Sequence, residues 1–134
     1  MRHQNWQHLL DEHVAAHQAA AFDWQANNCT TFAAAWVTLA TGLRTEVPTT
    51  SSARAALRAV KNLGGLHADA RRQLGEPLPG AFAWCGDLVL LKTPRSRGRV
   101  AYALGVCLGA VCAAPSAIGL MMLPITEAEA AWRV

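Results

Sequence analysis

The chain has 134 residues, a length that suits one domain with its own hydrophobic core. A net charge of only +3 argues against the strongly basic surface that a nucleic-acid-binding protein uses to contact phosphate. Hydrophobic residues make up 52% of the chain and charged residues 16%, a balance that suits a protein whose surface is partly covered by a partner.

Neither the N-terminal segment nor the longest uncharged run predicts export or membrane insertion. The first twenty residues lack the apolar stretch of a signal peptide. The uncharged run from Val100 to Ile125 is interrupted by glycine and proline and is a poor membrane span. We therefore expect a protein that stays in a cytosol, where its four cysteines are free thiols: Cys29, Cys85, Cys107 and Cys112.

Helical spacing predicts two helices in the first third of the chain. The first covers residues 4–20, where apolar side chains recur on one stripe. The second runs from about Cys29 to Ala40. Asn27 or Asn28 is its N-cap, because a short amide side chain accepts hydrogen bonds from the first backbone N–H groups, and Gly42 ends it. The aromatic pair before this helix is expected to anchor the incoming chain: Phe22 and Trp24.

Two further helices are predicted within the first 78 residues. Ser51 or Ser52 caps a third helix that closes at Gly64 and Gly65. A short fourth helix is expected from about Ala68 to Leu74. Residues 1–78 are therefore predicted to be mainly helical.

The pattern changes after residue 78, where short apolar runs alternate with turn residues. Three runs are typical of antiparallel strands: residues 86–92, 100–109 and 119–125. The last residues carry Thr126 and Glu129 at capping-box spacing and predict a short helix that ends at Trp132. Helices followed by strands indicate an α+β domain over residues 1–134, with 79–134 mainly antiparallel strands.

Cys29 is the candidate catalytic residue. A cysteine in the first turn of a helix lies at the positive end of the helix dipole, which favours the nucleophilic thiolate. Cysteine is also among the most commonly buried residue types, so a packing role explains the same position. The spacing by itself leaves both roles open.

The order of several short motifs resembles known families. "NNCTTFAAAWV", then "GDLVLLK" and "ALGVCLG", are similar to the NlpC/P60 cysteine peptidases, which have a papain-like fold. The chain also resembles, over nearly its full length, a family of small phage tail proteins of unknown function. The positions that carry this likeness are Phe22, Trp24, Cys29, Phe32, Gly42, Gly86, Asp87, Gly105, Cys107, Gly109 and the final "AWRV" (Ala131 to Val134). The resemblance implies that the N-terminal helices pack on an antiparallel sheet.

Two positions depart from the peptidase pattern. Asn28 precedes the cysteine where the active enzymes have Asp, and Ala103 occupies the position of the catalytic His. A cysteine peptidase needs that base to activate the thiol and to protonate the leaving amine. Of the five histidines, His3, His8, His13 and His17 precede Cys29, and none of the five follows the "GDL" motif. Cys29 therefore keeps the nucleophile position, and the site is expected to be inactive.

Metal and cofactor sites are not predicted. His13 and His17 share a helix face at i, i+4, but no Glu follows the first His as in zinc peptidases, and a packed or exposed helix face explains them. The cysteines lack the close pairs of structural zinc sites, and Cys85 and Cys107 are expected to pack within the sheet.

The resemblance implies a structural component of a phage tail tip that is assembled in the host cytoplasm and retained in the virion. Its partners would be hub, distal tail and fibre-bearing proteins. The alternative is an active cell-wall amidase or endopeptidase that uses Cys29 on peptidoglycan. Trp132 and Arg133 are candidate partner contacts, because Trp anchors many interfaces and Arg can bond an acidic group. Burial of Trp132 in the domain's own core is the competing interpretation.

Overall fold

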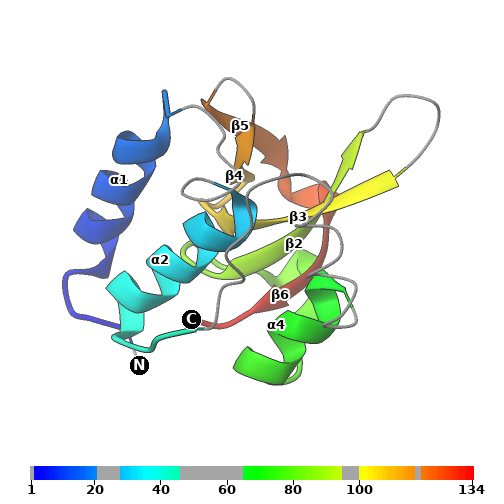
Figure 1. The fold of residues 1–134 in the computed structure, drawn as a ribbon, viewed down its shortest axis with the longest axis horizontal. Coiled ribbons are helices and arrows are strands. Elements are labelled where there is room, and N and C mark those ends of the chain that lie inside the picture. Colours follow the sequence, from blue (N-terminus) through cyan, green and yellow to red (C-terminus); the bar gives the residue numbers. More distant parts are fainter. Residues whose placement is uncertain (1, 21–27, 46–64, 95–99, 117–118) are drawn as a thin grey trace.

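The computed structural model describes residues 2–20, 28–45, 65–94, 100–116 and 119–134. Its helices are α1 (Trp6–His17), α2 (Cys29–Thr41) and α4 (Leu66–Leu74), and they lie beside one antiparallel sheet (Figure 1). These helices confirm the first, second and fourth predicted helices. The predicted third helix, apart from Gly65, and the aromatic pair Phe22 and Trp24 lie outside the described residues.

The sheet has the strand order β1-β6-β2-β3-β4-β5. Its members are β1 (Leu78–Pro79), β2 (Leu88–Pro94), β3 (Val100–Cys107), β4 (Val111–Ser116), β5 (Gly119–Pro124) and β6 (Ala128–Trp132). Every neighbouring pair is antiparallel, and two short 3₁₀ turns, η1 (Gly80–Phe82) and η3 (Ile125–Glu127), precede β2 and β6. The α+β class is thus confirmed, as are the three predicted strands.

The predicted C-terminal helix is wrong, because the chain there forms strand β6. Ala131 pairs with Val89 on one side and with Leu78 on the other, so β6 is an interior strand. Ala and Glu favour a helix locally, but pairing with two neighbouring strands outweighs a preference of a few tenths of a kcal/mol per residue. The C-terminal segment therefore joins β1 to the rest of the sheet.

Strand β4 was not predicted, because Pro115 and three small residues give it no clear strand pattern. Pro cannot donate a ladder hydrogen bond, so it disfavours an interior strand. In the described residues β3 pairs with β4 only at Val106–Ala113 and Cys107–Cys112. Pro115 lies beyond these pairs, where it has β5 as its pairing neighbour, and the missing N–H is tolerated there.

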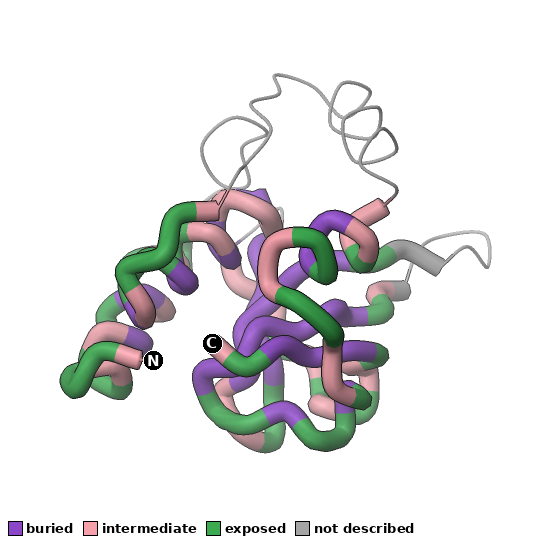
Figure 2. Tube along the Cα trace, turned by 90° about the horizontal axis from the view of Figure 1, so that it is seen from below, coloured by how far each residue is buried: buried purple, intermediate pink, exposed green. Residues whose placement is uncertain are grey.

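The helices cover one face of the sheet. Phe32, Trp36 and Ala40 of α2 pack with Leu10 of α1 and with Val106 of β3, and all five are buried. A neighbouring cluster joins α2 and α4 to the strands through Ala33, Ala70, Leu88, Leu90, Leu104, Ala130 and Trp132. Figure 2 shows this buried trace running through the strands, with the exposed parts of the helices outside it. Burial of these side chains is what fixes α2, and with it Cys29, against β3.

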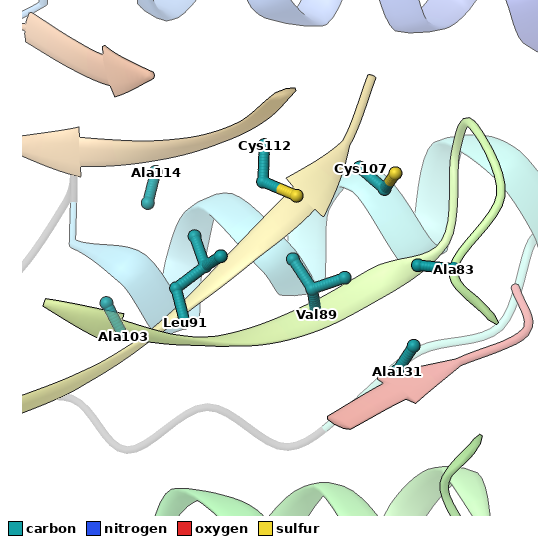
Figure 3. Packing of buried hydrophobic residues seen from close by; sticks show 8 residues of the cluster. All are labelled: Ala83, Val89, Leu91, Ala103, Cys107, Cys112, Ala114 and Ala131. Carbon is teal, nitrogen blue, oxygen red and sulfur yellow. The ribbon is translucent and has the colours of Figure 1, made fainter. Parts of the chain in front are cut away.

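The opposite face carries apolar side chains, most of them small, shown in Figure 3: Ala83, Val89, Leu91, Ala103, Cys107, Cys112, Ala114 and Ala131. Met121 and Leu123 of β5 and Ile125 of η3 pack against this cluster. A β-carbon added at Gly105 would lie 2.5 Å from the backbone oxygen of Ala113, so β3 and β4 approach too closely for a larger residue there. The core therefore has two layers, one on each face of the sheet.

Candidate functional site

Cys29 is the first residue of α2, as the sequence predicts. The Oδ1 atom of Asn28 accepts hydrogen bonds from the backbone N–H groups of Thr30 and Thr31, each at 3.0 Å. Thr31 Oγ1 in turn accepts from the Asn28 backbone N–H at 2.8 Å, which completes a capping box. Gly42 ends the helix with a left-handed φ of 77°. Local sequence thus fixes Cys29 in the first turn.

The Cys29 sulfur lies against β3 and is enclosed by hydrogen-bond donors. Cys107 donates its N–H to the Asp87 carbonyl across β2–β3, so by alternation the N–H of Leu104 points away from β2. The β4 strand does not pair with β3 at this point, and the Leu104 N–H bonds the Cys29 sulfur instead. The Thr30 hydroxyl lies 4.0 Å from the same sulfur. The environment therefore offers donors to a thiolate.

Burial outweighs these donors. Burial raises the pKa of the Cys29 thiol, and the hydrogen bonds from Leu104 and Thr30 lower it by less. Cys29 is partly buried as a residue and packs against the clusters on both faces of the sheet. The thiol therefore stays protonated at neutral pH, and protonated thiol is a poor nucleophile.

Histidines lie elsewhere in the fold. Ala103, at the position expected for the catalytic His, is a buried member of the small-residue cluster that Cys29 contacts. His13 is buried between α1 and α2, and its Nε2 donates to the Phe32 carbonyl at 3.1 Å. His67 packs edge-on to Trp132, with 5.6 Å between the ring centroids. Among the described residues no hydrogen bond joins an imidazole to Cys29.

The sequence did not single out Asp87 beyond its "GDL" motif, although it organises a second polar site. Its carboxylate is fully buried, and it pairs with Arg2 at 2.7 Å and with Arg133 at 3.0 Å. It also accepts the backbone N–H of Trp84 at 2.9 Å. Arg2 donates in addition to the carbonyls of Cys85 and Val134. One carboxylate thus ties both ends of the described chain to the 82–87 loop.

Trp132 and Arg133 have opposite surroundings although they are neighbours in sequence. Trp132 is 1% exposed, and its indole N–H donates to the Gly75 carbonyl at 3.0 Å. This is the core role that the sequence leaves open, and Trp132 does not present its ring to a partner. Arg133 keeps 42% of its side chain exposed and stacks 3.7 Å above the Trp84 ring.

Two large aromatic side chains lie exposed beside Arg133. Phe82 is 62% exposed and Trp84 is 68% exposed. Hydrogen bonds hold the loop that carries them. Gly86 donates its N–H to the Cys107 carbonyl and accepts a bond from the Trp36 indole, and the Asp87 carboxylate accepts the Trp84 N–H. We call Phe82, Trp84 and Arg133 the aromatic patch. Sequence periodicity does not identify it, because an isolated Trp in a turn gives no indication of its exposure.

A family model described as "Domain of unknown function (DUF6950)" matches residues 1–134. The chain belongs to the DUF6950 family. No curated protein and no solved structure matches the chain. For this family member the site geometry is therefore the guide to function.

The described residues offer no cluster of three or more His, Cys, Asp and Glu side chains that could hold a metal ion. The rings of His13 and His17 are 4.5 Å apart, but His13 is stacked on Phe32 and bonded to its carbonyl. Cys107 and Cys112 are buried in the sheet, whereas Cys85 is exposed, so its predicted packing in the sheet is wrong. Within the same described part of the chain, no helix is long and apolar enough to cross a membrane.

Proposed function

We propose that this chain is a structural component of a phage tail tip and that its NlpC/P60-like peptidase site is degenerate. The single observation that carries the loss of activity is the environment of Cys29: a protonated thiol at a helix start, with Ala103 rather than an imidazole on the neighbouring strand. A thiol without a general base is a poor catalyst, and this supports a packing role for Cys29. The phage tail assignment rests on the resemblance of the motif set.

An assembly protein needs a contact surface, and the aromatic patch has the properties of one. Trp and Arg are enriched among residues that contribute most to binding. The Trp84 backbone is bonded to Asp87 and its ring is stacked under Arg133, so little conformational freedom is lost when a partner covers it. We propose that the patch contacts another tail protein, in the role that the sequence assigned to Trp132. Arg133 keeps its candidate role, because 42% of its side chain is exposed beside Trp84 and a guanidinium can add a bond to an acidic group.

Complementation of a phage that lacks this gene tests the assembly role. We expect the wild-type chain and Cys29→Ala to restore infectious tails equally, and Trp84→Ala to restore fewer. Tyr102→Ala is the matched control, because Tyr102 is an aromatic residue of β3 that is also exposed, at 46%. Equal yields of infectious tails from all four chains would show that the aromatic patch is not needed for assembly. Absence of the chain from purified virions would refute a structural role.

Incubation with muropeptides tests the loss of activity. The purified chain and Cys29→Ala are expected to give the same background, because a raised pKa leaves little thiolate at neutral pH. Cys85→Ala serves as a control for the exposed thiol. Turnover by the wild-type chain and Cys85→Ala that is lost in Cys29→Ala would instead establish the cell-wall amidase or endopeptidase.

A further inference from the structure

Cys107 and Cys112 face each other across the turn that joins β3 to β4. Their positions are paired in the register of the two strands, and the Leu108 N–H donates to the Val111 carbonyl at 2.8 Å within the same turn. The Cys107 N–H points the other way, to Asp87 of the β2 side. The pair is therefore of the non-hydrogen-bonded type, in which opposite Cα atoms lie about 4.5 Å apart. Disulfides typically span Cα separations of about 4.4–6.8 Å.

The two side chains also occupy one face of the sheet. Both residues are 0% exposed and belong to the same cluster of small side chains (Figure 3). Burial raises the pKa of the Cys112 thiol to about 12, and the neighbouring Cys107 thiol contributes to the increase. Cys107 Sγ also receives the Gly109 N–H at 3.5 Å.

The pair lies at a junction of two strands that share few residue pairs. In the described residues β3 is paired with β4 only at Val106–Ala113 and Cys107–Cys112. On its other edge β3 pairs with β2 from Val106 to Val100, and β4 pairs with β5 from Val111 to Ser116. The cysteines therefore join two better-paired halves of the sheet.

From this placement we propose that Cys107 and Cys112 are a redox-sensitive pair that forms a cross-strand disulfide when the protein meets a small peroxide. The Cys107 thiolate attacks one peroxide oxygen, which yields a sulfenic acid at Cys107 and releases water from the second oxygen. The Cys112 sulfur then attacks the Cys107 sulfur, and the displaced hydroxide leaves as water with the Cys112 proton. Two thiols lose two electrons and two protons, and one hydrogen peroxide becomes two waters.

Burial of the two cysteines determines both the rate of their oxidation and its consequence. Peroxide reaches the pair only when the β3–β4 turn opens, so oxidation is expected to be slower than at the exposed Cys85. Once formed, the bond closes a short loop over residues 107–112 and holds β4 and β5 to the rest of the sheet. The inference rests on register and burial and is independent of the proposed function.

Mass spectrometry of the Cys29→Ala/Cys85→Ala variant tests the proposal, because this variant keeps only Cys107 and Cys112. We expect hydrogen peroxide to remove two hydrogens from the intact mass and to block alkylation of the denatured protein until a reductant is added. Addition of oxygen atoms alone, disulfide-linked dimers, or two thiols that remain open to alkylation would each overturn the proposal. Circular dichroism of the untreated variant checks that it is folded.

Hydrogen exchange gives a second readout that a surface oxidation would not change. Amides of residues 111–114, 116 and 119–123 are expected to exchange more slowly in the oxidised than in the reduced variant, because the bond restrains the pairing of β3 with β4. The same variant with Cys112→Ala added is the matched control, and peroxide should leave its exchange unchanged. Unchanged or faster exchange in the oxidised two-cysteine variant would contradict a bond that fits the native sheet.

Discussion

Arg2 and Asp87 form an ion pair across 85 positions of sequence, with 2.7 Å between Nη2 and Oδ1 and the carboxylate fully buried. Arg133 reaches the same carboxylate from the other end of the chain, at 3.0 Å. The guanidinium of Arg2 also lies 4.4 Å from the centroid of the Trp6 ring. This arrangement couples the start of α1, the loop before β2 and the end of β6.

Removal of the buried carboxylate is expected to be strongly destabilising. Asp87→Asn leaves two guanidinium groups without their counter-charge, and breaking a buried pair from one side typically costs about 3–5 kcal/mol. Urea denaturation measures the loss. Glu129→Gln is the control, because Glu129 and Lys92 are 3.8 Å apart on the surface, and an exposed pair contributes less than about 1 kcal/mol. Similar losses of stability in the two variants would show that the buried ion pairs of Asp87 contribute no more than an exposed pair.

Trp132 is expected to behave as a core residue. Trp132→Ala removes a fully packed side chain and its bond to Gly75, and such truncations cost about 3–5 kcal/mol. Trp84→Ala, at a 68% exposed position, should change stability by no more than about 1 kcal/mol. Denaturant midpoints of the two isolated variants compare these effects. A larger loss for Trp84→Ala would reverse the assignment of core and surface.

His13 is expected to make stability depend on mild acid. Burial lowers its pKa from 6.5 to about 4, with a smaller lowering by His17, while its bond to Phe32 opposes the shift. The unfolded chain therefore binds more protons than the folded chain between these values, and stability rises with pH across them. The full difference between the two pKa values corresponds to a loss of about 3 kcal/mol in the free energy of unfolding as the pH falls from 6.5 to 4.

Stability measured across this pH range checks the role of His13. His13→Phe should flatten the dependence, because Phe fills the stacked position without a titrating group. His8→Gln should leave it unchanged, because His8 lies on the exposed side of α1 with 64% of its side chain in solvent. If His13→Phe kept the wild-type slope, another group would be responsible.

Asn28 is expected to stabilise α2 through its cap. Asn28→Ala removes the acceptor for the N–H groups of Thr30 and Thr31, and loss of such a cap costs about 0.5–2 kcal/mol. Asn28→Asp keeps an acceptor and should retain stability, and it also restores the acidic residue found in the peptidase pattern. Thermal unfolding compares the two. Peptidase activity in Asn28→Asp would show that Asn28, rather than the missing base, limits the site.

Local sequence was sufficient for the site at Cys29. The Asn28 cap specifies the start of α2, the apolar spacing from Phe32 to Ala40 specifies its buried face, and Gly42 specifies its end. These features act within a few residues of one another, and each agrees with the structure. The change from helices to apolar runs after residue 78 likewise gave the α+β class. Such features depend on hydrogen bonds between near neighbours and on the periodic placement of apolar residues, and both can be inferred from the sequence.

Long-range pairing decided the rest. The segment 128–132 has a helical composition, yet it becomes an interior strand because Val89 and Leu78 lie on either side of Ala131. The Asp87 cluster joins residues 2, 87 and 133, and the Cys107–Cys112 pair depends on strand register. Burial of Trp132 beside exposure of Arg133 and Trp84 also follows from the way β6 enters the sheet. The sequence by itself determined the local elements, and only the tertiary structure decided which residues meet, because those contacts arise from packing between distant segments.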